Sequence, residues 1–139
     1  MSHVVVVDDD RAIRQLLSFA LELEAYEVTC LCDGRLVIET VERLSGPCVI
    51  LLDLMMPYVD GWAVCHSLSE RPELQYRCRV VLMTASVLDD HPLPPVVRSL
   101  LPKPFELGRV YPLLAVLMSE MTARAAEASS PPLVAHEVA

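Results

Sequence analysis

The sequence has very few lysines and few aromatic side chains. Of its 11 basic residues, Lys103 is the single lysine and the other ten are arginines. Aromatic residues make up 5% of the chain and hydrophobic residues 53%, so the core must consist mainly of Val, Leu, Ile and Ala. This composition favours buried parallel strands covered by helices over an antiparallel sandwich. At 139 residues, we expect one domain with a single core.

An excess of positive charge is also missing. The formal net charge is −8, which argues against an electrostatic surface for nucleic acid or anionic lipid. No apolar run reaches the ~18 residues that a membrane span needs. The N-terminus has no basic region or cleavage site of a signal peptide. We therefore expect a cytoplasmic protein with no nucleic-acid and no membrane partner.

The five cysteines lack the spacing of a zinc site. Cys30-Leu31-Cys32 is not a C-x₂-C pair and no histidine pair follows it. We interpret all five as reduced core or near-surface residues.

Strand-like and helix-like patterns alternate along the chain. The runs typical of strands are His3–Val7, Tyr26–Leu31, Cys48–Leu52, Arg79–Met83 and a short Leu100–Leu101. The helical patterns cover residues 11–24, Asp33–Leu44, Gly61–Ser69 and Leu107–Met121, where Pro112 is expected to kink or delay the helix. The alternation predicts an α/β fold, with a parallel sheet between helices on both faces.

Polar side chains follow four of these strands. They are Asp8, Asp9, Asp53, Thr84 and Lys103. In a doubly wound sheet, ligands bind beyond the carboxyl ends of the strands. We therefore expect these five side chains to converge on one edge.

The chemistry of this set indicates phosphoryl transfer. Asp8, Asp9 and Asp53 would repel one another, and a hard divalent cation with oxygen ligands relieves that repulsion. A carboxylate can act as nucleophile and form an aspartyl phosphate. Thr84 and Lys103 would then contact the phosphoryl oxygens. Taken singly, each feature has a structural interpretation as a turn, a helix cap or a surface residue.

The motifs resemble the receiver domain of two-component response regulators. The resemblance rests on four ordered segments: Val6-Val7-Asp8-Asp9-Asp10, Leu52-Asp53-Leu54-Met55-Met56-Pro57 with Asp60-Gly61, Met83-Thr84-Ala85 and Lys103-Pro104-Phe105. It implies a flavodoxin-like, doubly wound five-stranded parallel sheet of order 2-1-3-4-5 in three αβα layers.

The resemblance also implies roles. Asp53 would be phosphorylated by a sensor histidine kinase or a phosphotransfer protein. Asp9 would bind Mg²⁺ directly and Asp8 through water, with Asp53 and the backbone carbonyl of Met55 as further ligands; Mn²⁺ is an alternative ion. Thr84 and Lys103 would contact the phosphoryl group, and the Lys103–Pro104 bond would be cis. Such a protein is a phosphoacceptor and not an enzyme.

The sequence departs from the family pattern after the fourth strand. Pro92, Pro94 and Pro95 forbid a regular helix through their positions, so we expect the family's fourth helix to be shortened or disrupted. Leu100 stands where the family places its switch aromatic, which puts the usual output face in doubt.

We expect a receiver domain over residues 1–121 and a helical extension or flexible tail over 122–139. Our first hypothesis is a stand-alone receiver, monomeric or weakly dimeric, that signals to an unknown protein by contact. The alternative is a receiver-fold binding module whose output is independent of phosphorylation. A phosphohydrolase is disfavoured, because Met55 occupies the position where such enzymes carry an acidic acid/base residue.

Overall fold

The structure, a computed structural model, describes residues 2–85 and 92–129, with side chains through Arg124. The strands are β1 (His3–Val7), β2 (Glu27–Leu31), β3 (Cys48–Asp53), β4 (Cys78–Thr84) and β5 (Val97–Pro102). The helices are α1 (Arg11–Leu23), α2 (Val37–Arg43), α3 (Gly61–Ser69), α4 (Pro72–Arg77) and α5 (Leu107–Ser129), with a 3₁₀ turn η1 (Gly34–Leu36) before α2.

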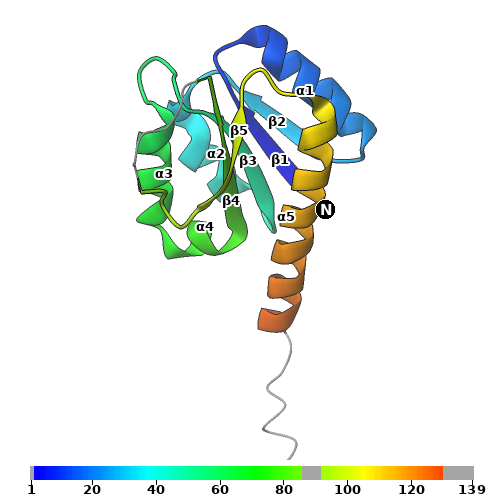
Figure 1. Ribbon diagram of the computed structural model, residues 1–139. Helices are drawn as coiled ribbons and strands as arrows, with labels where there is room; N and C mark the ends of the chain where they lie inside the picture. The colour runs from blue at the N-terminus through cyan, green and yellow to red at the C-terminus, as the bar shows by residue number, and fades with distance from the viewer. Residues whose placement is uncertain (1, 86–91, 130–139) are drawn as a thin grey trace, which may run out of the picture.

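Within the described residues, the five strands form one parallel sheet of order β2-β1-β3-β4-β5 (Figure 1). This confirms the α/β, flavodoxin-like sheet expected from the sequence. Consecutive side chains of a strand point to opposite faces, so Val4 and Val6 pack on one side and Val5 and Val7 on the other. Both faces are apolar because both are covered.

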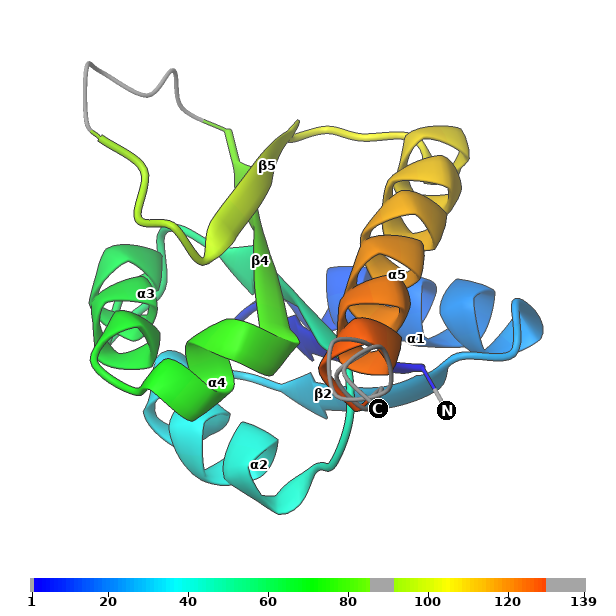
Figure 2. The ribbon, with the colours of Figure 1, turned by 90° about the horizontal axis from the view of Figure 1, so that it is seen from below.

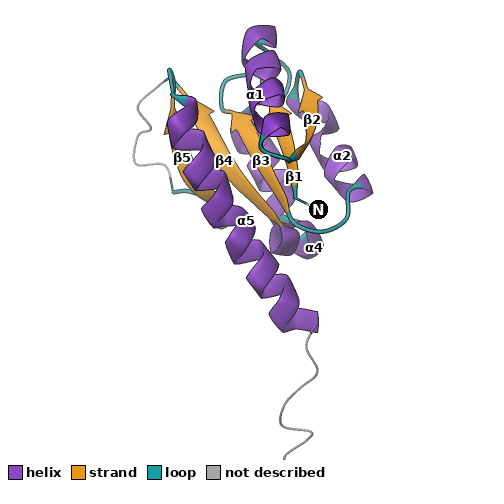
Figure 3. Cartoon of the chain, turned by 90° about the vertical axis from the view of Figure 1, so that its right-hand side faces the viewer, coloured by secondary structure: helices purple, strands orange, loops and turns teal. Residues whose placement is uncertain are grey.

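Helices α1 and α5 cover one face of the sheet and α2, α3 and α4 cover the other (Figures 2 and 3). Leu17 and Leu21 anchor α1, and Val110 and Leu114 anchor the first half of α5, all fully buried. The result is the three-layer arrangement that the sequence predicts. No helix of the described chain has the length and hydropathy that crossing a membrane requires.

Several element bounds differ from the sequence prediction. The second helix begins as the turn η1, with Asp33 accepting a hydrogen bond from the Arg35 N–H, and ends at Arg43. The fifth strand begins at Val97, three residues before the predicted start. Helix α5 begins at Leu107 with Pro112 inside it, so of the two effects expected from Pro112, a kink or a delayed start, the delayed start does not occur.

One helix was not predicted. Helix α4 occupies six residues between α3 and β4, with Pro72 in its first turn and Leu74 as its buried residue. Proline is tolerated there because the first N–H groups of a helix have no internal partner.

The segment that precedes β5 is not helical where it is described. Residues 92–94 have no regular structure, a turn follows, and the Val97 N–H donates to the carbonyl of Pro94 at 2.9 Å. Val96 and Val97 nevertheless pack into the core layer that α3 covers. The predicted disruption of the family's fourth helix agrees with this for residues 92–96, while residues 86–91 lie outside the described chain.

Candidate functional site

The strand register brings the predicted polar residues to one edge of the sheet. Val7 of β1 pairs with Leu52 of β3, so Asp8 and Asp53 follow at the same level. On the other side, Thr84 of β4 pairs with Pro102 of β5, so Lys103 comes next to them. The Lys103 N–H donates to the Thr84 carbonyl at 2.7 Å and extends this pairing by one residue.

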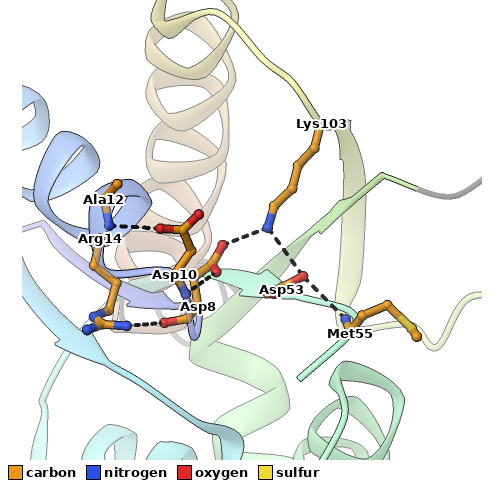
Figure 4. A network of polar contacts seen from close by, with 7 residues as sticks. All are labelled: Asp8, Asp10, Ala12, Arg14, Asp53, Met55 and Lys103. Atoms are coloured by element: carbon orange, nitrogen blue, oxygen red, sulfur yellow. Dashed lines mark hydrogen bonds and ion pairs between the residues drawn. The ribbon is translucent and has the colours of Figure 1, made fainter. Parts of the chain in front are cut away.

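Lys103 connects the two buried carboxylates. Its ammonium Nζ lies 2.8 Å from Asp8 Oδ2 and 3.4 Å from Asp53 Oδ1 (Figure 4). The Asp8 and Asp53 side chains are almost completely buried, while that of Lys103 is 18% exposed. An ionised carboxylate that is buried needs a positively charged partner. Lys103, the single lysine of the chain, supplies that charge to both aspartates.

The three consecutive aspartates differ in burial and in hydrogen bonding. Asp8 is buried, and its Oδ1 accepts a hydrogen bond from the Asp10 N–H at 2.9 Å. Asp9 is exposed at the mouth of the site. Asp10 is the N-cap of α1, where its side chain accepts from the Ala12 N–H at 2.9 Å (Figure 4). The triplet therefore supplies both the N-cap of α1 and two carboxylates of the acidic site.

The donor set suits a hard divalent cation. Asp8, Asp9 and Asp53 each present a carboxylate oxygen, and these oxygens lie within 4.8 Å of one another. Carboxylate oxygens are the ligands that Mg²⁺ prefers. The ammonium of Lys103 compensates only part of the negative charge of three carboxylates. A second positive charge at this site would therefore be electrostatically favourable.

Burial and neighbouring charges shift the pKa values of Asp53 and Lys103. Burial, together with the negative charge of Asp8, raises the pKa of Asp53 from 3.8 to about 6, although Lys103 opposes the shift. Burial by itself would lower the pKa of Lys103, but its hydrogen bond and ion pairs with Asp8 and Asp53 raise it. The ammonium thus stays charged wherever the carboxylates can ionise.

Met55 and Thr84 are the two remaining predicted site residues. The Met55 N–H donates to Asp53 Oδ1 at 3.3 Å, and its side chain is 70% exposed. Thr84 is buried at the end of β4. All six predicted site residues therefore lie at one edge, and their individual roles stay predictions. The Lys103–Pro104 peptide bond is cis, as expected.

Two supporting residues were not identified from the sequence. Arg14 donates from Nη1 to the backbone carbonyl of Asp8 at 2.7 Å and ties α1 to the end of β1. A Cβ atom on Gly61 would lie 2.9 Å from both the Asp53 carbonyl oxygen and Leu54 Cα. Gly61 could have been identified, because it belongs to the Asp60-Gly61 pair of the motif. Arg14 belongs to no motif, and the sequence does not distinguish it from the other nine arginines.

Comparison with known proteins assigns the family. A model of the response regulator receiver domain matches residues 4–111, most of the chain. The chain belongs to the response regulator receiver family. A receiver domain is a phosphoacceptor module of two-component signalling rather than an enzyme, and receivers generally act with histidine kinases. This receiver has the acidic pocket of Asp8, Asp9 and Asp53 that is typical of the family's Mg²⁺ site.

Solved structures agree in fold. The Vibrio cholerae chemotaxis protein CheY4 superimposes with a TM-score of 0.75 at 23% identity, covering 84% of this chain and 98% of CheY4. A CheY-like receiver from Methanospirillum hungatei gives 0.71 at 22% identity, covering 89% and 97%. The Thermotoga maritima response regulator TrrA, in complex with Mg²⁺-BeF, gives 0.72 at 23% identity, covering 84% and 99%.

Proposed function

We propose that this receiver acts in the cytoplasm, accepts a phosphoryl group on Asp53 from a sensor histidine kinase or phosphotransfer protein, and signals through protein contacts. The observation that carries the proposal is the position of Asp53. Its carboxylate lies 3.4 Å from the Lys103 ammonium and within 4.8 Å of carboxylate oxygens of Asp8 and Asp9, at the carboxyl edge of the sheet.

The chain's own groups fit this reaction. A carboxylate oxygen of Asp53 would form the new bond to phosphorus while the bond to the donor's leaving group breaks. Lys103, already 3.4 Å from Asp53, would neutralise charge on one phosphoryl oxygen, and Thr84 would donate to another. The Met55 N–H and the N-cap at Asp10 hold the surrounding backbone in place before the donor arrives.

Asp8, Asp9 and Asp53, with the Met55 carbonyl, would hold the cation. Mg²⁺, or Mn²⁺ in its place, would supply positive charge for the equatorial oxygens of the transferred group. The complex of the related TrrA with Mg²⁺-BeF supports this choice of ion.

The test is intact mass spectrometry of the full chain after incubation with Mg²⁺ and acetyl phosphate. We expect wild type to gain one phosphate and Asp53→Asn to gain none. Asp10→Asn is the matched control, because asparagine also caps helices and Asp10 is not a proposed ligand. EDTA should abolish the uptake. A wild type that stays unmodified with Mg²⁺ contradicts the proposal.

The second candidate is a binding module that works without phosphorylation. The non-helical residues 92–96 and the half-exposed Leu100 on β5 favour it, since the family's usual switch elements differ there. This candidate predicts equal affinity of wild type, Asp53→Asn and phosphorylated protein for the downstream protein, and no change in oligomeric state on phosphorylation. A change in either quantity contradicts it and supports the phosphorylation-dependent function.

A further inference from the structure

A separate pocket lies at the amino ends of β4 and β5, remote from the acidic edge. It has a volume of about 350 Å³, and α4, β4, β5 and α5 all contribute to its lining. Figure 2 shows α4 beside the end of α5 in the view from below. The polar side chains in the lining are Gln75, Tyr76, Arg79, Arg98 and Arg124.

The pocket concentrates positive charge in an acidic protein. Arg79, Arg98 and Arg124 converge here, whereas the chain as a whole carries a formal charge of −8. Among the described residues, Glu120 is the carboxylate that pairs with this group, 3.5 Å from Arg98. In the described part of the chain, one carboxylate for three guanidinium groups leaves the pocket with a net positive charge.

Burial and the two neighbouring arginines disfavour the charged form of Arg79. Burial, followed by the charges of Arg124 and Arg98, lowers the pKa of Arg79, and Glu120 only partly opposes this. Three like charges held together cost free energy, and a bound anion would recover it. The phosphoryl chemistry at Asp53 uses none of these residues.

Contacts within the protein orient two of the three guanidinium groups, those of Arg79 and Arg124. Arg79 Nη1 donates to the carbonyls of Gln75 and Cys78, both at 2.8 Å, which ties it to the end of α4. The Arg124 guanidinium lies 4.3 Å from the centre of the Tyr76 ring, and the Tyr76 hydroxyl donates to the Arg124 carbonyl at 3.3 Å. A preorganised site loses less conformational entropy on binding.

We propose that this pocket binds the polyphosphate group of a small molecule, such as a nucleoside diphosphate. Guanidinium presents planar pairs of N–H donors that match phosphate oxygens, and several of them on separate elements suit a ligand with more than one charge. The volume lies at the small end of the ~300–1,000 Å³ typical of small-molecule sites. The site is independent of phosphorylation at Asp53.

The test is isothermal titration of the full-length protein with ADP and with inorganic pyrophosphate. EDTA is present throughout, so that no cation can hold phosphate at the acidic edge. Arg98→Gln and Arg124→Gln each remove one charge from partly exposed side chains and should preserve the fold, which thermal unfolding verifies. Arg43→Gln on α2 is the matched control, since Arg43 is also exposed and its ion pair with Glu39 is remote from the pocket.

We expect saturable binding of at least one probe, weakened about tenfold by Arg98→Gln and by Arg124→Gln and unchanged by Arg43→Gln. Tighter binding of ADP than of pyrophosphate would show that the nucleoside contributes contacts; equal binding would show that the phosphates suffice. Absence of binding for both probes in the millimolar range overturns the proposal. Equal weakening by Arg43→Gln also overturns it, because only net charge would then matter.

Discussion

At the scale of single residues, the environment of Asp53 makes the stability of the cation-free protein depend on pH. The pKa of this carboxyl in the folded protein is about 6, above its ordinary 3.8, mainly because of burial and the charge of Asp8. The folded state therefore binds this proton more tightly than the unfolded chain. The resulting stabilisation is fully present below pH ~4 and is lost as the pH rises through about 6.

Asp53→Asn should consequently unfold at a higher temperature than wild type at a pH of about 8 without divalent cations, because the amide stays neutral. The difference should shrink as the pH falls towards about 4. Thermal unfolding in EDTA at both pH values measures it, with Asp10→Asn as the exposed control. A difference that is the same at both values would show that the ionisation of Asp53 does not cause it.

Lys103 offers a second residue-scale prediction. Lys103→Arg keeps the positive charge but replaces a compact ammonium, placed between Asp8 and Asp53, by a larger planar group. The rate of phosphate uptake from acetyl phosphate should fall on the order of tenfold to a hundredfold. Lys103→Gln, which removes the charge, should lower it further. Uptake by Lys103→Arg at the wild-type rate would mean that charge alone is needed.

At the scale of elements, Gly61 determines how closely α3 approaches the end of β3. Gly61→Ala should destabilise the protein by about 1–3 kcal/mol and slow phosphorylation, because the new Cβ would be 2.9 Å from the backbone of Asp53 and Leu54. Denaturant unfolding and the uptake assay measure the two effects. Gly108→Ala is the control: its Cβ meets nothing within 4 Å in α5, so stability should be unchanged or higher.

The strands and most helices could be predicted because their apolar periodicity is strong. The Val run of β1 and the buried β3 show this, and so does Gly61–Ser69, whose predicted bounds agree with α3. Helix α4 escaped prediction because six residues with one buried leucine have no periodicity; Pro72 was the available signal. The early start of β5 depends on pairing with β4, which no local pattern encodes.

The acidic edge was predictable for a different reason. Its residues lie at or just after the carboxyl ends of strands, so the parallel topology alone brings them together. The arginine pocket had no such signal. Arg79, Arg98 and Arg124 stand in no motif, and Arg124 lies beyond the predicted end of the last helix at Met121. Their convergence depends on the length of α5 and on the placement of the unpredicted α4.

At the scale of the whole molecule, we propose that residues 1–121 are sufficient for the receiver. Through Arg124, where its side chains are described, α5 buries Val110, Leu114, Leu117, Met118 and Met121. A chain that ends at Met121 keeps all of these and should fold and take up phosphate like the full chain. It lacks Arg124, so its binding of ADP or pyrophosphate should be weakened. Circular dichroism tests the folding of the shortened chain, the uptake assay its phosphorylation, and titration its binding of ADP and pyrophosphate. Loss of the fold would contradict the proposed boundary at Met121.

Helix α5 also changes the shape of the molecule. Its 23 residues extend about 35 Å, whereas strands of five to seven residues extend about 17–24 Å, and Figures 1 and 3 show the helix projecting past the sheet. A compact body with a rod at one end does not rotate equally fast about all axes. Amide N–H bonds in α5 lie along the rod, so their NMR relaxation should report slower tumbling than that of N–H bonds directed across the sheet.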